Sequence, residues 1–209
     1  MKLTCEQKDL NSALNIVNRA IGTGNTLPVL NNILLKAEGK KLFFTTTNLE
    51  IAINCSIEAN VKNEGAITVP AKVFTNYISL LRPGDVSLEV GEGLTMNVKA
   101  EHENIKIKGI KIDEFPLIPQ MDKKEFFKVP AKTLKEMANQ VTFSASNNLS
   151  RPVLMGVLFE VKGDQFKMVT TDSYRLSEKS INLKSDIEMS CVVPSRTISE
   201  LAKILDDSS

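Results

Sequence analysis

The sequence of 209 residues predicts an α+β protein made of duplicated units, each a helix followed by short antiparallel strands. Two observations predict this class. Val69, Val129 and Val193 each begin a stretch that continues with Pro, then Ala or Ser, then Lys or Arg, and each stretch leads into a helical pattern. Between the helical patterns lie short β-branched and apolar runs bounded by Gly, Asn and Asp, as is typical of strands.

The helices are predicted from a stripe of apolar side chains. Counted from each basic residue, apolar or small residues recur in the spacing of an amphipathic helix with one buried face. The four stripes are Leu10, Ala13, Leu14, Val17; Phe74, Tyr77, Ile78, Leu81; Leu134, Met137, Ala138, Val141; and Ile198, Leu201, Ala202, Leu205. The basic starts are Lys8, Lys72, Lys132 and Arg196, spaced 64, 60 and 64 residues apart. Pro70, Pro130 and Pro194 are expected at the first helical position.

Strands are predicted in three groups, one after each of the first three helices. The first group is 29–36, 41–46, 50–57 and 66–69. The second is 86–90, 94–99, 104–112 and 125–129, and the third is 153–161, 166–170, 175–183 and 188–193. The last strand of each group leads into the next helix.

Two such units give a domain of about 120 residues, which is a common size. The sequence therefore predicts one domain at 1–120 and a second at 125–209, joined by the proline-containing segment 115–124. The fourth helix is not followed by strands. We therefore expect the second domain to be incomplete, either because the chain is a fragment or because this helix packs without them.

The amino-acid composition argues against several classes of protein. There are 26 basic and 25 acidic residues, which argues against a nucleic-acid binder that works by bulk positive charge. Cys5, Cys55 and Cys191 have the spacing of neither a disulfide framework nor a zinc site. The start of the chain carries no apolar signal core, and no apolar run is long enough to cross a membrane. We therefore expect a cytoplasmic protein with no membrane contact.

The polar faces of the four helices combine basic residues with Asn, Ser and Thr. Such side chains contact phosphates without reading bases, so Lys8, Lys72, Lys132 and Arg196 are candidates for sequence-independent contacts with duplex DNA. A basic residue in the first turn also opposes the helix dipole, at a cost of roughly 0.3–1 kcal/mol. The alternative is four ordinary solvated faces with few acids, and these residues favour neither reading.

Nothing in the sequence indicates catalysis, a metal or a cofactor. His102, the only histidine, lies between Glu101 and Glu103 and is expected at the surface. P-loop, HExxH and GxSxG patterns are absent from the sequence. Asp172 and the other acids near turns are expected to act as caps and breakers. An enzyme with an unrecognised carboxylate site, tested by changing Asp172, stays as a third possibility.

Several longer motifs resemble the bacterial DNA polymerase III beta subunit family of sliding clamps. The matching stretches, which span nearly the whole chain in order, are 25–30, 47–51, 67–72, 115–116, 151–160 and 171–176. The resemblance implies a DNA clamp fold with helices on one face of curved sheets. It also implies a non-catalytic processivity factor: a head-to-tail homodimer ring around double-stranded DNA that tethers the polymerase. The family's third domain is absent from this sequence, so the chain alone is expected neither to close a ring nor to offer a complete cleft.

The resemblance also implies two sets of site residues. The family's DNA contacts fall on Gly24, Lys72, Asn148, Pro152 and Val153, beside Arg151. Its cleft for partner peptides, from the polymerase III alpha subunit, the clamp loader and other clamp-motif proteins, falls partly on Leu154, Thr171, Ser173, Tyr174, Arg175 and Leu176. From residues alone this stretch could be an ordinary turn, with Leu154 and Leu176 in the core. The functional alternative is a repeat-built protein-interaction scaffold with no DNA role.

Overall fold

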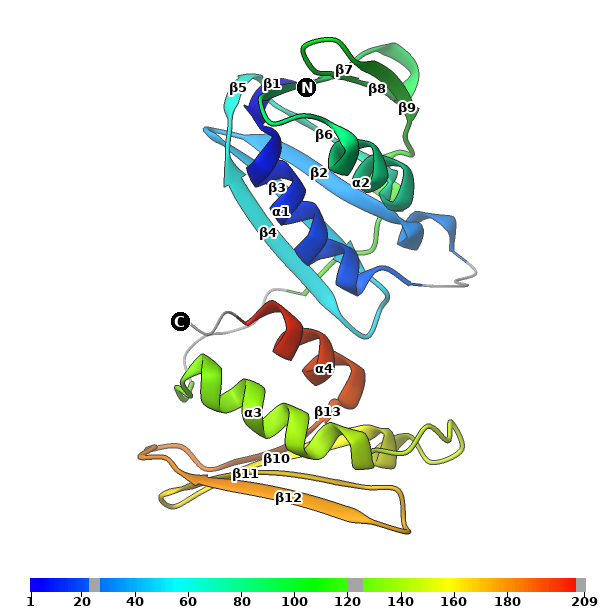
Figure 1. Ribbon diagram of the computed structural model, residues 1–209. Helices are drawn as coiled ribbons and strands as arrows, with labels where there is room; N and C mark the ends of the chain where they lie inside the picture. Colours follow the sequence, from blue (N-terminus) through cyan, green and yellow to red (C-terminus); the bar gives the residue numbers. More distant parts are fainter. Residues whose placement is uncertain (23–26, 120–125, 206–209) are drawn as a thin grey trace. The chain divides into compact units, whose positions relative to one another are not determined.

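The computed structural model describes residues 1–22, 27–119 and 126–205. The chain divides into two compact parts, Met1–Pro119 and Gln120–Ser209, each with its own helices and at least one sheet (Figure 1). We call these parts the first and the second unit; each is larger than the helix-and-strand repeat predicted from the sequence. The α+β class is confirmed, because helices pack against antiparallel sheets in each unit.

The described residues of the first unit form two α-helices and two sheets. Its helices are α1 (Gln7–Val17) and α2 (Ala71–Leu80), which pack against each other. One sheet has the order β5-β1-β7-β8-β9 and the other β4-β3-β2-β6. The strands are β1 (Lys2–Glu6), β2 (Asn32–Glu38), β3 (Lys41–Thr47), β4 (Ala52–Glu58), β5 (Asn60–Asn63), β6 (Gly65–Pro70), β7 (Asp85–Val90), β8 (Thr95–Lys99) and β9 (Asn104–Lys108).

In the second unit, the described residues form two α-helices on one sheet. Both α3 (Ala131–Val141) and α4 (Ser195–Ile204) lie on the same face of the sheet β12-β11-β10-β13 (Figure 1). The strands are β10 (Gly156–Lys162), β11 (Gln165–Thr171), β12 (Leu176–Asn182) and β13 (Met189–Pro194). Short 3-10 turns follow α3 at Thr142–Ser144 and precede β10 at Pro152–Met155.

The two units repeat the same arrangement. The order β4-β3-β2-β6 in the first unit corresponds to β12-β11-β10-β13 in the second. The register also corresponds, since Leu34 pairs with Thr45 and Thr68 just as Leu158 pairs with Val169 and Val192. The predicted duplication is therefore present in the strand pairing as well as in the helices.

The predicted helical stripes form the cores. The first core gathers α1, α2 and the inner faces of both sheets around Leu14, Phe44 and Phe74, none of which is exposed. The second gathers α3, α4 and the inner face of β10 and β11 around Phe166, whose ring lies 5.1 Å from Phe127 and 5.4 Å from Phe159. Full burial of one such side chain contributes roughly 1.5–3 kcal/mol.

The four helices are confirmed, with one correction at their starts. Pro70, Pro130 and Pro194 are not the first helical residues but the N-cap residues, each with ψ in the extended range. Pro70 and Pro194 are also the last residues of β6 and β13. A proline has no N–H to leave unpaired at this junction, so it suits the change from strand to helix.

Several strand predictions were wrong at their starts. The chain before β2 and β10 forms 3-10 turns, Pro28–Asn31 and Pro152–Met155, instead of strand. In each turn a hydrogen bond closes the backbone, from Leu30 N to Leu27 O and from Leu154 N to Arg151 O, both 3.1 Å. Proline fixes φ near the value that such a turn requires.

The strand predicted at 104–112 ends at Lys108, because the chain then crosses to β6. Gly109 donates to Leu94 O, and Ile110 exchanges backbone hydrogen bonds with Thr68. A Cβ atom at Gly109 would lie 2.5 Å from Thr68 O, so only glycine allows this approach.

The strand predicted at 125–129 is absent from its described part, 126–129. Its counterpart β1 pairs with β5 and β7, and the described residues of the second unit include no strand beside this segment. Phe127 still packs on Phe166 as a core side chain. The sequence reading also missed β1 and β5 themselves.

None of the helices formed by the described residues is long and apolar enough to cross a membrane.

Candidate functional site

Each helix presents a basic side chain close to its start. Lys8, Lys72, Lys132 and Arg196 are all exposed in the first turn of α1, α2, α3 and α4. The remaining residues of the first turns of α2, α3 and α4 are uncharged. These basic groups are thus held on helix surfaces, one pair in each unit.

Several polar side chains of α1 and α2 already form hydrogen bonds within the protein. Asn18 Nδ2 donates to Thr75 Oγ1 at 2.8 Å and so ties the end of α1 to α2. The hydroxyl of Ser12 donates to Lys8 O, and the hydroxyl of Ser79 to Asn76 O, both at 2.9 Å. These serines bond to their own helices, so the exposed lysines are the groups better placed to meet a phosphate.

The loop at residues 145–151, the α3–β10 loop, is held by its own polar groups. Ser146 N donates to Leu154 O at 2.8 Å, which ties the start of the loop to the following 3-10 turn. Asn148 N donates to Ser146 Oγ, and Asn148 Oδ1 accepts from Ser150 N at 2.9 Å. Asn148 therefore shapes the loop in addition to being exposed on it.

The 3-10 turn after this loop exposes apolar surface. Pro152 is exposed, Val153 is 70% exposed and Leu154 is half-buried. The equivalent residues of the first unit, Val29 and Leu30, are 4% and 2% exposed. The second unit therefore offers an apolar surface at a position that the first unit keeps covered.

Four of the six predicted peptide-cleft residues, Thr171, Ser173, Tyr174 and Arg175, lie where β11 turns into β12, at residues 171–175, which we call the β11–β12 turn. Thr171 Oγ1 donates to Arg175 O at 2.7 Å and accepts from Ser173 N at 3.1 Å. Asp172 Oδ1 accepts from the backbone N–H groups of Tyr174 and Arg175, both at 3.0 Å. These two bonds lower the pKa of Asp172 below its ordinary value, with a smaller effect from the Arg175 charge. Ser173 has a left-handed backbone with φ of 79°.

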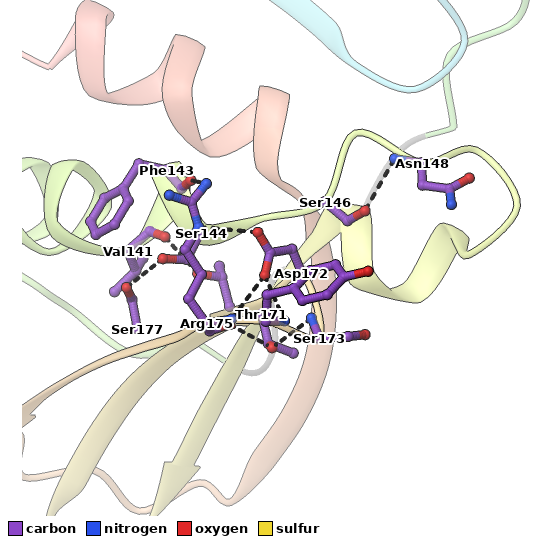
Figure 2. A network of polar contacts seen from close by, with 12 residues as sticks. Val141, Phe143, Ser144, Ser146, Asn148, Thr171, Asp172, Ser173, Arg175 and Ser177 are labelled. Atoms are coloured by element: carbon purple, nitrogen blue, oxygen red, sulfur yellow. Dashed lines mark hydrogen bonds and ion pairs between the residues drawn. The ribbon is translucent and has the colours of Figure 1, made fainter.

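The Arg175 guanidinium is held by two residues on opposite sides (Figure 2). Nε donates to Asp172 Oδ2 at 3.1 Å, and Nη2 donates to Phe143 O at 2.8 Å. The guanidinium also lies over the Phe143 ring, 5.6 Å from its centroid. Phe143 belongs to the 3-10 turn after α3, whose Ser144 hydroxyl lies 2.6 Å from that of Ser177 on β12.

The structure brings together residues that the sequence assigned to two different sites. Arg151, expected at DNA, donates from Nη1 to Ser173 Oγ at 3.1 Å, and Ser173 was expected in the peptide cleft. The α3–β10 loop and the β11–β12 turn also line one hollow of about 360 Å³, formed by Ala145, Ser146, Asn147, Asn148, Arg151, Asp172, Tyr174 and Arg175. Peptide-cleft and DNA-contact candidates are therefore neighbours in the second unit.

The other cleft candidates differ in exposure. Tyr174 is 97% exposed and Leu176 is 63% exposed, so neither is a core residue. Leu154 is half-buried, and the hydroxyl of Thr171 already forms two hydrogen bonds within the β11–β12 turn. Gly24, expected to contact DNA, lies outside the described residues.

Sequence reasoning missed Phe143 and the role of Asp172. The sequence does contain one indication that Asp172 shapes a turn. Thr47-Asn48 and Thr171-Asp172 occupy equivalent places in the repeat, where β3 and β11 end. No sequence signal pointed to Phe143, which lies 32 residues before Arg175.

In the described parts of the chain, the histidine and the cysteines do not join a metal-binding cluster. His102 is exposed, with Nε2 3.6 Å from Glu101. Within the described ranges, no group of three or more His, Cys, Asp or Glu residues is placed to hold a metal ion.

Comparison with protein families finds two consecutive matches. Residues 1–119 match the model of the DNA polymerase III beta subunit, N-terminal domain, and residues 128–209 match that of its central domain. Together they cover both units of the structure.

Individual proteins agree with these matches. The beta sliding clamps of Synechocystis sp. and Synechococcus elongatus are 31% and 33% identical to this chain, over 98% of it in each case. The crystal structure of the Bacillus subtilis DNA polymerase sliding clamp superposes with a TM-score of 0.95 at 27% identity, over 99% of the chain. The chain spans 58%, 56% and 57% of these three relatives.

Proposed function

This chain belongs to the DNA polymerase III beta subunit family, and we propose that it serves as the sliding clamp of bacterial DNA replication. In that role the intact ring, a head-to-tail homodimer, encircles duplex DNA and tethers DNA polymerase III without a catalytic reaction of its own. One observation carries the proposal. Each of the helices α1 to α4 of this family member has an exposed basic residue in its first turn. As a replication factor, the protein would work in the cytoplasm.

Weak contact with DNA suits this role. A clamp must stay on DNA yet move along it, so each helix should offer one or two mobile cations instead of a fixed phosphate pocket. Exposed lysine side chains such as Lys72 and Lys132 meet that need, since their flexible stems let the charge follow the backbone. The near-balanced total charge limits tight, immobile binding.

We further propose that the exposed apolar and cationic side chains of the second unit contribute to a site for partner peptides. Leu154 and Leu176 would receive apolar anchors, while Tyr174 and Arg175 would hold the peptide's polar atoms. The DNA polymerase III alpha subunit, the clamp loader and other clamp-motif proteins are the partners that this role requires.

Primer extension on a long singly primed template tests the proposal. With the intact ring, its clamp loader and the polymerase present, we expect longer products per binding event than with the polymerase and loader alone. Templates of unrelated sequence should respond equally, because helix-face lysines read no bases. Unchanged product length, or an effect confined to one sequence, would contradict the proposal.

A further inference from the structure

The repeat supplies an internal control for the β11–β12 turn. The equivalent turn of the first unit joins β3 to β4, and its backbone bonds are the same. Thr47 Oγ1 donates to Ile51 O and accepts from Leu49 N, while Asn48 Oδ1 accepts from the N–H groups of Glu50 and Ile51. Leu49 has the same left-handed backbone as Ser173, with φ of 76° against 79°.

The turn itself therefore does not require a carboxylate. Asn48 builds it with one side-chain oxygen, as Asp172 does with Oδ1. The second oxygen of Asp172 makes a bond that has no counterpart in the first unit, to Arg175 Nε at 3.1 Å. An asparagine carries an NH₂ group there and could not accept this bond. The second unit thus has an acid at position 172 and an arginine at 175 that bond to each other. The first unit has Asn48 and the buried Ile51 at the equivalent positions, so it has no such pair.

Arg175 is anchored although it is exposed. Its side chain is 57% exposed, yet Nε, Nη2 and the face of the guanidinium each have a partner, supplied by Asp172 and Phe143. A guanidinium has five N–H groups, and among the described residues Arg175 uses two in hydrogen bonds. The other three donors have no hydrogen-bond partner in the described ranges and can donate to a ligand.

The anchored guanidinium borders the hollow that Arg151 and Tyr174 also line. The residues that line the hollow include two arginines and one aspartate, so the lining has an excess of positive charge and of N–H donors. Such a place favours an oxygen acceptor, either a carboxylate or a main-chain carbonyl. Because Arg175 adjoins the exposed Leu176, a peptide held there by apolar contact brings its acceptors within reach of the same surface.

We propose that Asp172 is a positioning residue that, together with Phe143, holds the Arg175 guanidinium ready to bind an oxygen acceptor of a partner peptide. The inference rests on the proposed function, because it assigns a task within the proposed peptide site. Its physical basis is preorganisation: an arginine already ordered in the free protein loses less side-chain freedom on binding. Ordering one such side chain costs about 0.5–1.5 kcal/mol, which corresponds to about 2- to 12-fold in affinity, so releasing it should weaken binding by about 3- to 10-fold, within that range.

The variant Asp172→Asn should keep the backbone hydrogen bonds of the β11–β12 turn and remove only the bond to Arg175 Nε. Asn48 shows that asparagine supports the same backbone bonds, so the amide NMR signals of Tyr174 and Arg175 should stay dispersed. The Arg175 Nε–H signal, distinct in the unchanged protein, should move to the position of solvent-exposed arginines. Asn48→Asp in the first unit is the matched control, since buried Ile51 follows it in place of an arginine and peptide binding should be unaffected.

The binding probe is a fluorescent peptide copied from the clamp-binding segment of the DNA polymerase III alpha subunit. Asp172→Asn should weaken its binding about 3- to 10-fold. Arg175→Ala should weaken it at least as much, and the double variant should be no weaker than Arg175→Ala alone. Phe143→Leu, which keeps the carbonyl but removes the ring, should weaken binding about 2- to 5-fold.

The sign of the change is decisive. If Asp172 acted only as a nearby negative charge, removing it would tighten the binding of an acidic peptide. Unchanged or tighter binding by Asp172→Asn, or losses that add in the double variant, would overturn the positioning role and leave the proposed function standing. No binding by the unchanged protein would instead overturn the proposed peptide site, and the positioning role with it.

Discussion

Thr46 and Thr170 illustrate how single residues fix each unit. Both are buried on the central hairpin of a sheet, and each donates its hydroxyl to a carbonyl in the last turn of a helix, Val17 O and Val141 O respectively. The end of a helix leaves its last carbonyls without partners inside the helix. The threonines supply the missing donors from the sheet.

Thr46→Val should therefore destabilise the first unit. Valine keeps the shape but removes the hydroxyl that donates to the buried Val17 O, and the loss of one such hydrogen bond costs about 0.5–1.5 kcal/mol. Urea unfolding followed by circular dichroism measures the loss. The neighbouring Thr45→Val, whose hydroxyl bonds Asn54 at the surface, should change the free energy of unfolding by no more than about 0.5 kcal/mol. Equal losses in the two variants would contradict this account of Thr46.

The cysteines should differ in reactivity because their environments differ. Cys5 is 5% exposed, and burial, followed by the charges of Asp9 and Asp85, raises its pKa from 9.0 to about 12. Cys191 is exposed on β13. In mildly alkaline buffer, a thiol-alkylating reagent should modify Cys191 first and Cys5 only after unfolding, as mass spectrometry of digested protein would show.

The pH dependence from Cys5 has a definite sign. Its pKa is higher in the folded protein than in the unfolded chain, so its contribution to stability is complete below about pH 9 and is lost as pH rises toward 12. Cys5→Ser should reduce this alkaline loss of stability. Rapid modification of Cys5 in the folded protein would contradict the burial on which both expectations depend.

At the scale of elements, the helices were predictable because a period of 3.6 residues, repeated four times in one register, is hard to produce by chance. Strand limits were less predictable, since tertiary contacts set them. The 3-10 turns at Pro28 and Pro152 take up residues that look like strand, and β9 stops where Gly109 crosses β6. The edge strand β5 is short and polar, so its sequence carries almost no strand pattern.

The helix faces give a prediction about salt. Each phosphate neutralised contributes a slope of about −0.9 to the logarithm of DNA affinity against that of salt concentration. We expect the wild-type slope to be shallow. Lys72→Glu and Lys132→Glu should each reduce its magnitude by about 0.9, as measured by fluorescence anisotropy with duplex DNA. Lys62→Glu, an equal change of charge on the edge strand β5, should alter the slope less. Equal effects of all three variants would point to net charge and not to the helix faces.

At the scale of the whole molecule, the duplication was visible in the sequence, whereas the organisation of the candidate site was not. A resemblance could place Tyr174 and Arg175 in a peptide site, because those residues sit in a matching motif. It could not show that Asp172 and Phe143 hold Arg175, or that Arg151 reaches Ser173, since both depend on how distant segments pack.

The proposed clamp makes a topological claim that a single measurement can test. The protein from its complete gene, with its loader, is placed on closed circular DNA, separated from free protein, and the circle is then cut once by a restriction enzyme. A ring that encircles DNA without gripping it should remain on the closed circle and leave after the cut. Continued retention on the cut DNA, or no retention on the circle, would contradict the proposal that this protein is a sliding clamp.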